Sequence, residues 1–290
     1  MKDDPAHKKL VKKATKMLNP LKTTGCEPEE MKTIDGEPLT LESYWATNLH
    51  PVQFLWIFEL FNDNMLEMYK RSNWGYEEES KKQELQATTA RYIIVKDSKK
   101  KHVGYVHYRF VVDYGFPAVY CFELQIAPAY QKRGVGSLLI DILVNLAKKT
   151  GMHKVMATVF MFNYESLAFF HKNGFRLDAS TPTATDCDYF ILSRNVLPGK
   201  EPIINKENSA ASAATIENDD ILGKMIKARY NPAENAAMED DIIAQLINSK
   251  INPKKDDEVV DTSKSIILKA SAEAKKKNSA SKTVDDAGKK

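Results

Sequence analysis

The sequence predicts an α/β fold in which helices flank a mixed sheet. Short runs rich in β-branched and aromatic residues alternate with runs of helical period across residues 51–197, as is typical of such folds. A glycine-rich turn joins an apolar run to an amphipathic one between residues 121 and 147. Beyond this region the composition changes to Asn, Ala, Asp, Lys and Ser. We therefore divide the chain into a lead-in (1–50), a folded domain (51–197) and a low-complexity tail (198–290).

Length and composition exclude several classes of protein. The 290 residues carry a net charge of only +3, so the chain is not globally a polycation. The cysteines Cys26, Cys121 and Cys187 lie far apart and form no C-x-x-C pair, so we expect no metal site and no disulfide framework. We expect no secretory leader and no membrane span, because the amino terminus is polar and no apolar run is long enough. A reducing compartment is expected: the cytosol, the nucleus or both.

The lead-in begins with a basic helical pattern. Residues 7–22 are rich in lysine, and one helical face carries Leu10, Val11, Ala14, Met17 and Leu18. The pair Asn19-Pro20 is expected to end this helix. We favour a helix packed on the domain; the alternatives are a nuclear-import signal and a patch for acidic partners. Residues 23–50 are expected to be irregular.

The domain opens with a long helix from Pro51, whose apolar stripe ends in an aromatic cluster near Trp74. The charged run Glu77–Glu84 is interpreted as a solvated helix. The expected strands are residues 92–95, 103–112, 118–126, 153–159 and 188–192. Pro128 ends the third of them, because proline cannot donate to a strand ladder.

The turn after that third strand has the form of an anion site. Gly134 and Gly136 lack a Cβ, so the backbone can approach a ligand closely. A helix follows from Ser137, and the first amides of a helix point outward unpaired while its dipole favours an anion. The turn therefore predicts a site for a phosphate or pyrophosphate. It lacks the features of a P-loop and of a dinucleotide fingerprint, and a plain packing turn is the alternative.

The tail holds a weak repeat. Residues 219–232 and 240–253 each begin with acidic residues and end in Asn-Pro, which favours two short helices. Helices of this length need a partner surface, although coincidence in a low-complexity segment explains the pattern nearly as well. Residues from about 271 onward are predicted to be disordered.

The glycine turn also carries a family resemblance. Residues 131–136, Gln-Lys-Arg-Gly-Val-Gly, match the Q/R-x-x-G-x-G/A signature of the GCN-five-related N-acetyltransferases (GNAT), where this segment binds the pyrophosphate of acetyl-CoA. Asn163 and the run 168–175 resemble the helix and Gly-Phe turn that follow in that superfamily. The resemblance implies the GNAT fold, with a mostly antiparallel twisted sheet, and acetyl-CoA as co-substrate.

Residues 54–194 further resemble the N-terminal acetyltransferase D (NatD) family. The resemblance rests on His-Tyr-Arg-Phe at 107–110, on Tyr-Cys-Phe-Glu at 120–123 and on stretches around residues 74, 158 and 189. It implies transfer of acetyl to the α-amine of histone tails that begin Ser-Gly-Arg-Gly, in the nucleus and the cytoplasm.

Glu123 is the predicted catalytic residue. An amine attacks a thioester only when it is uncharged, and an α-amine has a pKa of about 7.7–8.0, against about 10.4 for lysine. A mild base therefore suffices, and the family resemblance favours Glu123 as the group that takes the proton, directly or through water. The alternatives are that Glu123 holds the substrate amine as a counter-ion or pairs with a lysine.

The resemblance implies the residues that hold the co-substrate. Amides from Gln125 to Ala127 would stabilise the negative charge that develops on the thioester oxygen. The predicted cofactor-binding set is Gln125, Ile126, Ala127, Arg133, Gly134, Val135, Gly136, Ser137, Leu138 and Asn163. Many relatives carry a tyrosine acid where this chain has Phe170. Since thiols have a pKa near 8.5, the thiolate leaves unprotonated or another group serves.

The resemblance also implies how substrate is bound. The predicted substrate-binding residues are Tyr69, Trp74, Asp113, Phe122, Thr158 and Tyr189. Packing in the core is the alternative for Tyr69, Trp74, Thr158 and Tyr189. Asp113 matches one of two acidic positions that receive the substrate's arginine, whereas Val111 occupies the other. Because a carboxylate–guanidinium pair is strong and directional, we expect looser arginine selection than in the family.

Two other kinds of function compete with this one. The first is acetylation of other amino termini or of lysine side chains. The second is a non-catalytic acetyl-CoA-binding scaffold whose tail helices recruit a partner. We expect no specific nucleic-acid binding, because no base-reading motif appears in the sequence.

Overall fold

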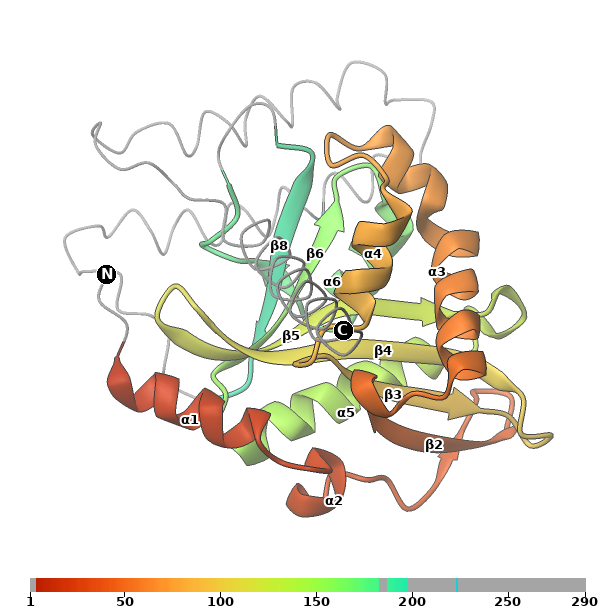
Figure 1. Cartoon of the computed structure of the whole chain (residues 1–290), viewed down its shortest axis with the longest axis horizontal. Coiled ribbons are helices and arrows are strands. Elements are labelled where there is room, and N and C mark those ends of the chain that lie inside the picture. The colour runs from red at the N-terminus through yellow and green to blue at the C-terminus, as the bar shows by residue number, and fades with distance from the viewer. Residues whose placement is uncertain (1–3, 183–186, 198–222, 224–290) are drawn as a thin grey trace, which may run out of the picture.

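One twisted sheet of eight strands organises the part of the chain that this computed structural model describes, residues 4–182, 187–197 and Gly223 (Figure 1). The strand order is β1-β2-β3-β4-β5-β6-β8-β7. All neighbouring pairs are antiparallel except β5 and β6. The predicted α/β class, with a mixed and mostly antiparallel sheet, is confirmed.

The strands are β1 (Met31–Lys32), β2 (Pro38–Trp45), β3 (Arg91–Lys96), β4 (His102–Asp113), β5 (Phe116–Ile126), β6 (Lys154–Phe160), β7 (Arg176–Leu177) and β8 (Tyr189–Asn195). The helices are α1 (Pro5–Thr15), α2 (Pro20–Thr24), α3 (Pro51–Arg71), α4 (Glu78–Leu85), α5 (Val135–Thr150) and α6 (Tyr164–Lys172), with short 3₁₀ turns at Ala46–Asn48 and Pro128–Tyr130.

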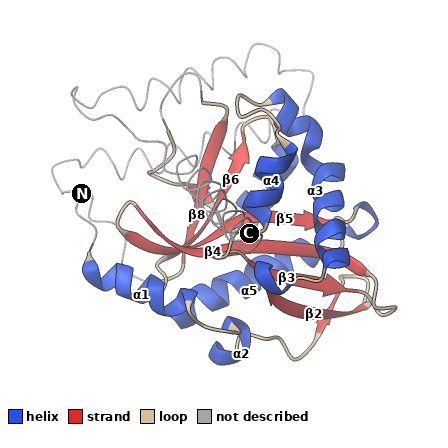
Figure 2. Ribbon diagram, viewed as in Figure 1, coloured by secondary structure: helices blue, strands red, loops and turns tan. Residues whose placement is uncertain are grey.

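Alternation along the strands gives the sheet two apolar faces. In β3, Ile93 and Val95 belong to one buried cluster, while Tyr92 and Ile94 belong to another, as the period of two in a strand requires. The first face is covered by apolar side chains of α1, α2, α5 and α6, and the second by α3. Figure 2 shows α3 and α4 in front of the sheet and α5 behind it.

The lead-in differs from its prediction in two ways. Residues 38–45 are not irregular: β2 pairs with β3 over six residues, from Thr40 opposite Lys96 to Trp45 opposite Arg91. The basic helix ends at Thr15, and Pro20 begins α2 instead of ending α1. The favoured packing is confirmed, because Ala14 is buried against the sheet.

The charged run at residues 77–84 was predicted to be solvated, and this is wrong for two of its members. Lys81 and Glu84 are only 6% and 5% exposed, because they lie on the face of α4 that turns toward β5. The long helix from Pro51 is confirmed as α3. Its first turn is stabilised by the ring of His50, which accepts a hydrogen bond from the Val52 amide at 3.3 Å.

The sheet opens between its two parallel strands. β5 and β6 pair only from Ala118 opposite Lys154 to Cys121 opposite Ala157, although both strands continue beyond that point. A shift in register between β4 and β5 lies at the same level, next to Tyr108, and such bulges bend a strand. The two strands therefore separate toward their carboxyl ends, which places a gap beside Glu123.

The last predicted strand is confirmed as β8, and β7 was not predicted. The tail segments 219–232 and 240–253 lie outside the described residues, apart from Gly223. Among the described residues, no helix is both long and apolar enough to span a bilayer.

Candidate active site

A cavity of about 1120 Å³ lies where β5 and β6 separate. Its walls come from the carboxyl halves of both strands, the second half of α3, the glycine turn, α6 and residues 30–34 of the lead-in. The predicted residues that line it are Tyr69, Trp74, Phe122, Glu123, Gln125, Ile126, Gly134, Gly136, Ser137, Leu138, Thr158 and Asn163.

The glycine turn has the backbone that an anion site requires. Gly134 has a φ of +87° and directly precedes α5, a conformation that glycine adopts without strain. The first backbone bond of the helix runs from the Leu138 amide to the Gly134 carbonyl at 3.1 Å. The amides before Leu138 therefore have no partner within the helix. A Cβ on Gly136 would lie 3.1 Å from the ring of Phe169, so a side chain here would intrude on the cavity wall.

Arg133 is not directed into the cavity as predicted. Its Nε and Nη2 bind the two carboxylate oxygens of Asp35 at 3.1 and 2.5 Å, and Nη2 also binds Glu37 at 2.8 Å. The guanidinium holds the pKa of Asp35 down at about 2, so this pair stays charged at any working pH. Val135 likewise points away from the cavity, since it is 1% exposed and belongs to the core.

Lys132 is the cation that the turn presents instead. It lines the cavity, its side chain is 86% exposed, and its Nζ lies 3.9 Å from Glu165. Its φ of +59° is unusual for a residue other than glycine. Lys132 was not predicted, because the sequence does not show which of the two adjacent cations, Lys132 and Arg133, points toward the cavity.

Glu123 lies on β5 at the level where the sheet opens, and it is 6% exposed. Its Oε1 is 2.5 Å from the Nζ of Lys81, and its Oε2 accepts a hydrogen bond from the Gln125 side chain at 2.8 Å. Asn64 of α3 holds Gln125 in turn, at 3.0 Å. Every oxygen of the carboxylate therefore has a partner, and its orientation is fixed.

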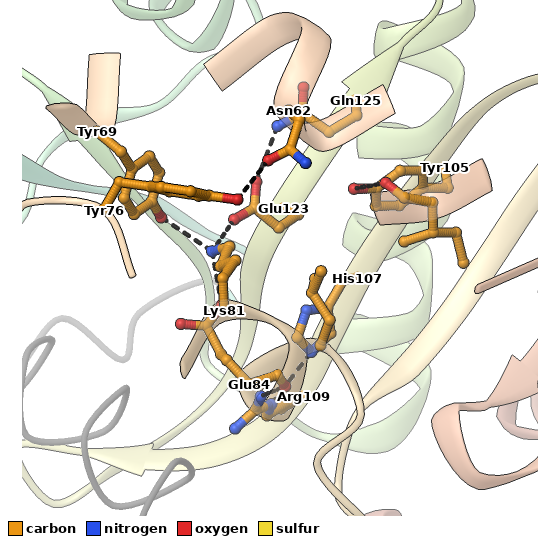
Figure 3. A network of polar contacts seen from close by, with 12 residues as sticks. Asn62, Tyr69, Tyr76, Lys81, Glu84, Tyr105, His107, Arg109, Glu123 and Gln125 are labelled. Carbon is orange, nitrogen blue, oxygen red and sulfur yellow. Dashed lines mark hydrogen bonds and ion pairs between the residues drawn. The ribbon is translucent and has the colours of Figure 1, made fainter. Parts of the chain in front are cut away.

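Lys81 is the centre of this network (Figure 3). Its ammonium donates to Glu123 at 2.5 Å, to Glu84 at 2.8 Å and to the Tyr69 hydroxyl at 2.9 Å, which uses all three of its N–H groups. It also lies 4.4 Å from the centre of the Phe61 ring, within the range of a cation–π contact. The sequence left open that Glu123 pairs with a lysine, and Lys81 is that lysine.

The electrostatics of this cluster are dominated by burial. Burial raises the pKa of Glu123, the charge of Lys81 opposes this, and the charge of Glu84 adds to it, so that the pKa stays above its usual value. Burial disfavours the ammonium of Lys81, but Glu123 and Glu84 outweigh it and hold that pKa well above the ordinary range. When all three groups are ionised, their charges sum to minus one.

The predicted oxyanion donors are only partly available. The amide of Ala127 donates to the carbonyl of Val103 at 2.9 Å, so it is committed to β4. Amides of neighbouring strand residues point to opposite edges, which directs the Ile126 amide away from β4 and toward the gap. The Ile126 carbonyl points the same way, since it accepts from Asn64 at 3.2 Å and from Gln131 at 3.1 Å.

Asn163 and Phe170 lie on the α6 side of the cavity. The side chain of Asn163 accepts from the Ser166 amide at 3.1 Å and so begins α6. That bond engages only Oδ1 of the side chain, and the contact of Asn163 with the co-substrate stays a prediction. Phe170, which stands where relatives carry a tyrosine, is 7% exposed and cannot donate a proton.

Four of the six predicted substrate residues line the cavity. Tyr69, Trp74, Phe122 and Thr158 do so, and the hydroxyls of Thr158 and Tyr120 are hydrogen-bonded. Tyr189 lies behind Trp74, with ring centres 5.0 Å apart. It belongs to the aromatic cluster that supports the wall.

Asp113 lies apart from the cavity, contrary to its predicted role. It is 1% exposed at the far end of β4, and its carboxylate is 3.2 Å from the Nζ of Lys154, which also binds Asp178 at 2.8 Å. A guanidinium from a substrate cannot reach it without breaking this buried pair. Within the described residues, no cluster of His, Cys, Asp or Glu is arranged to hold a metal ion.

Comparison with known proteins agrees with this fold. Residues 55–175 match the model of the acetyltransferase (GNAT) family. Nourseothricin acetyltransferase is a similar solved structure, with 17% identity, a TM-score of 0.33, and coverage of 38% of this chain and 66% of its own. This chain thus spans 66% of the length of that enzyme.

Two further similar structures are aligned over nearly their whole length. Spermidine N-acetyltransferase from Vibrio cholerae, in complex with CoA and spermine, is 18% identical over 54% of this chain and 95% of its own, with a TM-score of 0.41. Arabidopsis thaliana Naa50, in complex with the bisubstrate analogue CoA-Ac-MVNAL, is 17% identical over 54% and 97%, with a TM-score of 0.39. Likenesses at this level carry no argument about substrate.

Proposed function

We propose that residues 55–175, which match the model of the acetyltransferase (GNAT) family, form an acetyl-CoA-dependent acetyltransferase domain that acetylates the α-amine of protein amino termini. Histone tails that begin Ser-Gly-Arg-Gly are the proposed substrates and partners, reached in the nucleus and the cytoplasm. The observation that carries the proposal is the buried carboxylate of Glu123, which lines the cavity beside the glycine turn and is held by Lys81 and Gln125.

A carboxylate in the wall of the cavity suits an amine substrate. Glu123 can attract the ammonium group of an incoming amino terminus, because opposite charges at close range favour their ionised forms. The same carboxylate can then take a proton from the nitrogen. An α-amine gives up that proton about 2.5 pK units more readily than a lysine side chain, a difference of ~3.4 kcal/mol. A base as weak as the Glu123 carboxylate therefore favours the α-amine of an amino terminus over the amine of a lysine side chain.

Acetyl transfer at this site needs one proton acceptor. The uncharged amine nitrogen attacks the thioester carbon, the bond from that carbon to sulfur breaks, and CoA leaves as a thiolate. Glu123 passes the proton that it took from the ammonium to solvent before the attack. The nitrogen carries one extra proton once the N–C bond has formed, and it gives this second proton to Glu123, from which it passes to solvent or to the thiolate. Glycine-turn amides hold the pyrophosphate, and the Ile126 amide points toward the gap in which the thioester oxygen gains charge.

The deciding experiment compares two peptides that differ only at the amino terminus. One begins Ser-Gly-Arg-Gly with a free α-amine and carries an internal lysine; the other is the same peptide with a blocked terminus. We expect acetylation of the free peptide at its first residue, detected by mass spectrometry, and none of the blocked one. Glu123→Gln should reduce kcat by about a hundredfold or more. The full chain is used throughout.

Other outcomes identify the competing functions. Equal modification of both peptides at lysine would mean a lysine acetyltransferase. Tight acetyl-CoA binding without turnover on any free amine would mean a scaffold. Neither result is compatible with the proposed activity.

A further inference from the structure

We propose that Lys81 is a positioning residue for acetyl transfer, which fixes the carboxylate of Glu123 and keeps it ionised while Glu84 holds Lys81 in place. The proposal rests on the proposed function, because it gives Lys81 its role through Glu123. Lys81 lies 42 residues before Glu123 in the sequence. It belongs to α4, whose many charged residues led to the prediction of a solvated helix.

The geometry of Lys81 is more restrained than a surface ion pair. Its side chain is 5% exposed, and so are those of its partners, at 5% for Glu123 and 6% for Glu84. All three N–H groups are used, and the rings of Phe61 and Tyr69 lie 4.4 and 4.8 Å from the nitrogen. Four residues thus surround the ammonium, namely Phe61, Tyr69, Glu84 and Glu123. They restrict it to one position, and that position fixes Oε1 of Glu123.

The charge pattern explains why a lysine is needed here. Without Lys81, two carboxylates would share one buried site, and like charges in such a site do not both ionise. Glu123 would then favour its protonated form more strongly, and a protonated Glu123 cannot accept another proton from the substrate. Lys81 prevents this, whereas Glu84 acts on Glu123 in the opposite direction.

Other groups surround Glu123 and are held constant in this design. Those that interact with it electrostatically or lie beside it are Tyr69 of α3, Lys81 and Glu84 of α4, Tyr92 of β3, Tyr105, His107 and Arg109 of β4, and Cys121 and Gln125 of β5. Burial, with the charges of Arg109 and Lys81, lowers the pKa of His107 well below its ordinary value, which favours the neutral imidazole. Only Lys81 and Glu84 are changed.

The two changes should move that acidic limb in opposite directions. Lys81→Met removes the positive charge that lowers the pKa of Glu123, so the limb of kcat/KM moves to higher pH. Glu84→Gln removes the negative charge that raises this pKa, so the limb moves to lower pH. Lys81→Arg should restore the wild-type limb in part. At pH 7 we expect Lys81→Met to lose about tenfold or more in kcat, with the KM for acetyl-CoA unchanged.

Lys82→Met is the matched control, because Lys82 is the adjacent lysine on α4 but pairs with Glu78 and Glu79 at the surface. It should leave the profile unchanged. Circular dichroism and thermal melting identify any variant that fails to fold, and Lys81→Arg retains the charge if Lys81→Met is unstable.

A second readout does not depend on turnover. Carbon-13 NMR of the glutamate carboxyl carbons follows the titration of Glu123 directly, with Glu123→Gln used to assign its signal in the full chain. The signal should titrate at higher pH in Lys81→Met and at lower pH in Glu84→Gln. If it titrates at the same pH in all chains, Lys81 is merely structural and the inference is wrong. If the opposite shifts appear but no amine is acetylated, the charge relation holds and the proposed function fails.

Discussion

At the scale of single residues, Gly136 shows why the turn requires a residue without a Cβ atom. Its neighbour Phe169 belongs to the cavity wall. Gly136 lies within α5, where alanine would favour the helix by roughly 1 kcal/mol. We expect Gly136→Ala to leave the melting temperature unchanged or slightly higher, while the Kd of acetyl-CoA, measured by calorimetry, rises about tenfold or more.

Asn145→Ala serves as the comparison for that variant, because Asn145 also lies on α5 but is exposed and does not line the cavity. If Gly136→Ala binds acetyl-CoA as tightly as Asn145→Ala does, the turn tolerates a side chain. The backbone approach proposed for the pyrophosphate would then be wrong.

A second residue-scale prediction concerns the third residue of the substrate. Asp113 is engaged by Lys154, and Val111 occupies the other expected acidic position. Replacing arginine by alanine at position three of the peptide should therefore reduce kcat/KM by less than about tenfold. Loss of a desolvated carboxylate–guanidinium pair costs ~2–5 kcal/mol, which would be a thirtyfold or greater reduction. A loss of that size would show that an acidic receptor exists.

The candidate site was predictable where its signal is local. Gly134 and Gly136 follow from the chemistry of one continuous stretch, and the choice of Glu123 rests on the family resemblance of that same stretch. Lys81 could not be identified, because its partner Glu123 is 42 residues away and four other charged residues surround it in sequence. Arg133 was predicted to bind the pyrophosphate of acetyl-CoA. Its actual partner, Asp35, lies 98 residues away, and the sequence gives no sign of that pairing.

At the scale of elements, the loop between β1 and β2 changes what the glycine turn offers. The Ile34 amide donates to the Arg133 carbonyl at 3.0 Å, and Asp35 and Glu37 hold the Arg133 side chain. We expect Arg133→Ala to alter the Kd of acetyl-CoA by less than about threefold, because its charge is already neutralised. Lys132→Ala should weaken binding by about fivefold or more, with a smaller effect at high salt.

If Arg133→Ala weakened acetyl-CoA binding more than Lys132→Ala did, Arg133 would have to leave Asp35 when acetyl-CoA binds. Asp35→Asn separates these cases, because it loosens the arginine without removing it. If Arg133 makes no contact with the co-substrate, Asp35→Asn should change the Kd of acetyl-CoA no more than Arg133→Ala does.

The elements themselves were predicted unevenly. α3, α5 and the central strands have strong periodic patterns and were all predicted. β2 was missed because it begins at Pro38 and its last five residues are all half-buried. Buried and exposed residues therefore do not alternate along most of this strand. α4 was predicted as a helix, but its buried face consists of Lys81, Glu84 and Leu85, and polar residues on a buried face give no hydrophobic signal.

At the scale of the whole molecule, the cavity depends on segments that are far apart in the chain. Its walls include residues 30–34 of the lead-in and residues 163–172 at the other end of the domain. The sequence divided the chain at residue 51, and that boundary leaves out β1 and β2, which belong to the same sheet. A sheet is completed by pairing between distant strands, so a boundary set by composition alone does not find its edge.

The pairing of β2 with β3 has a practical consequence for anyone who expresses part of this gene. A fragment of residues 51–197 would uncover one whole edge of β3, whose Tyr92, Ile93, Ile94 and Val95 are fully buried in the intact protein. Bare edges of this kind recruit other chains. We expect that fragment to elute as aggregates in size-exclusion chromatography, and one of residues 4–197 to elute as a soluble species. A soluble, cooperatively melting 51–197 fragment would show that β2 is dispensable.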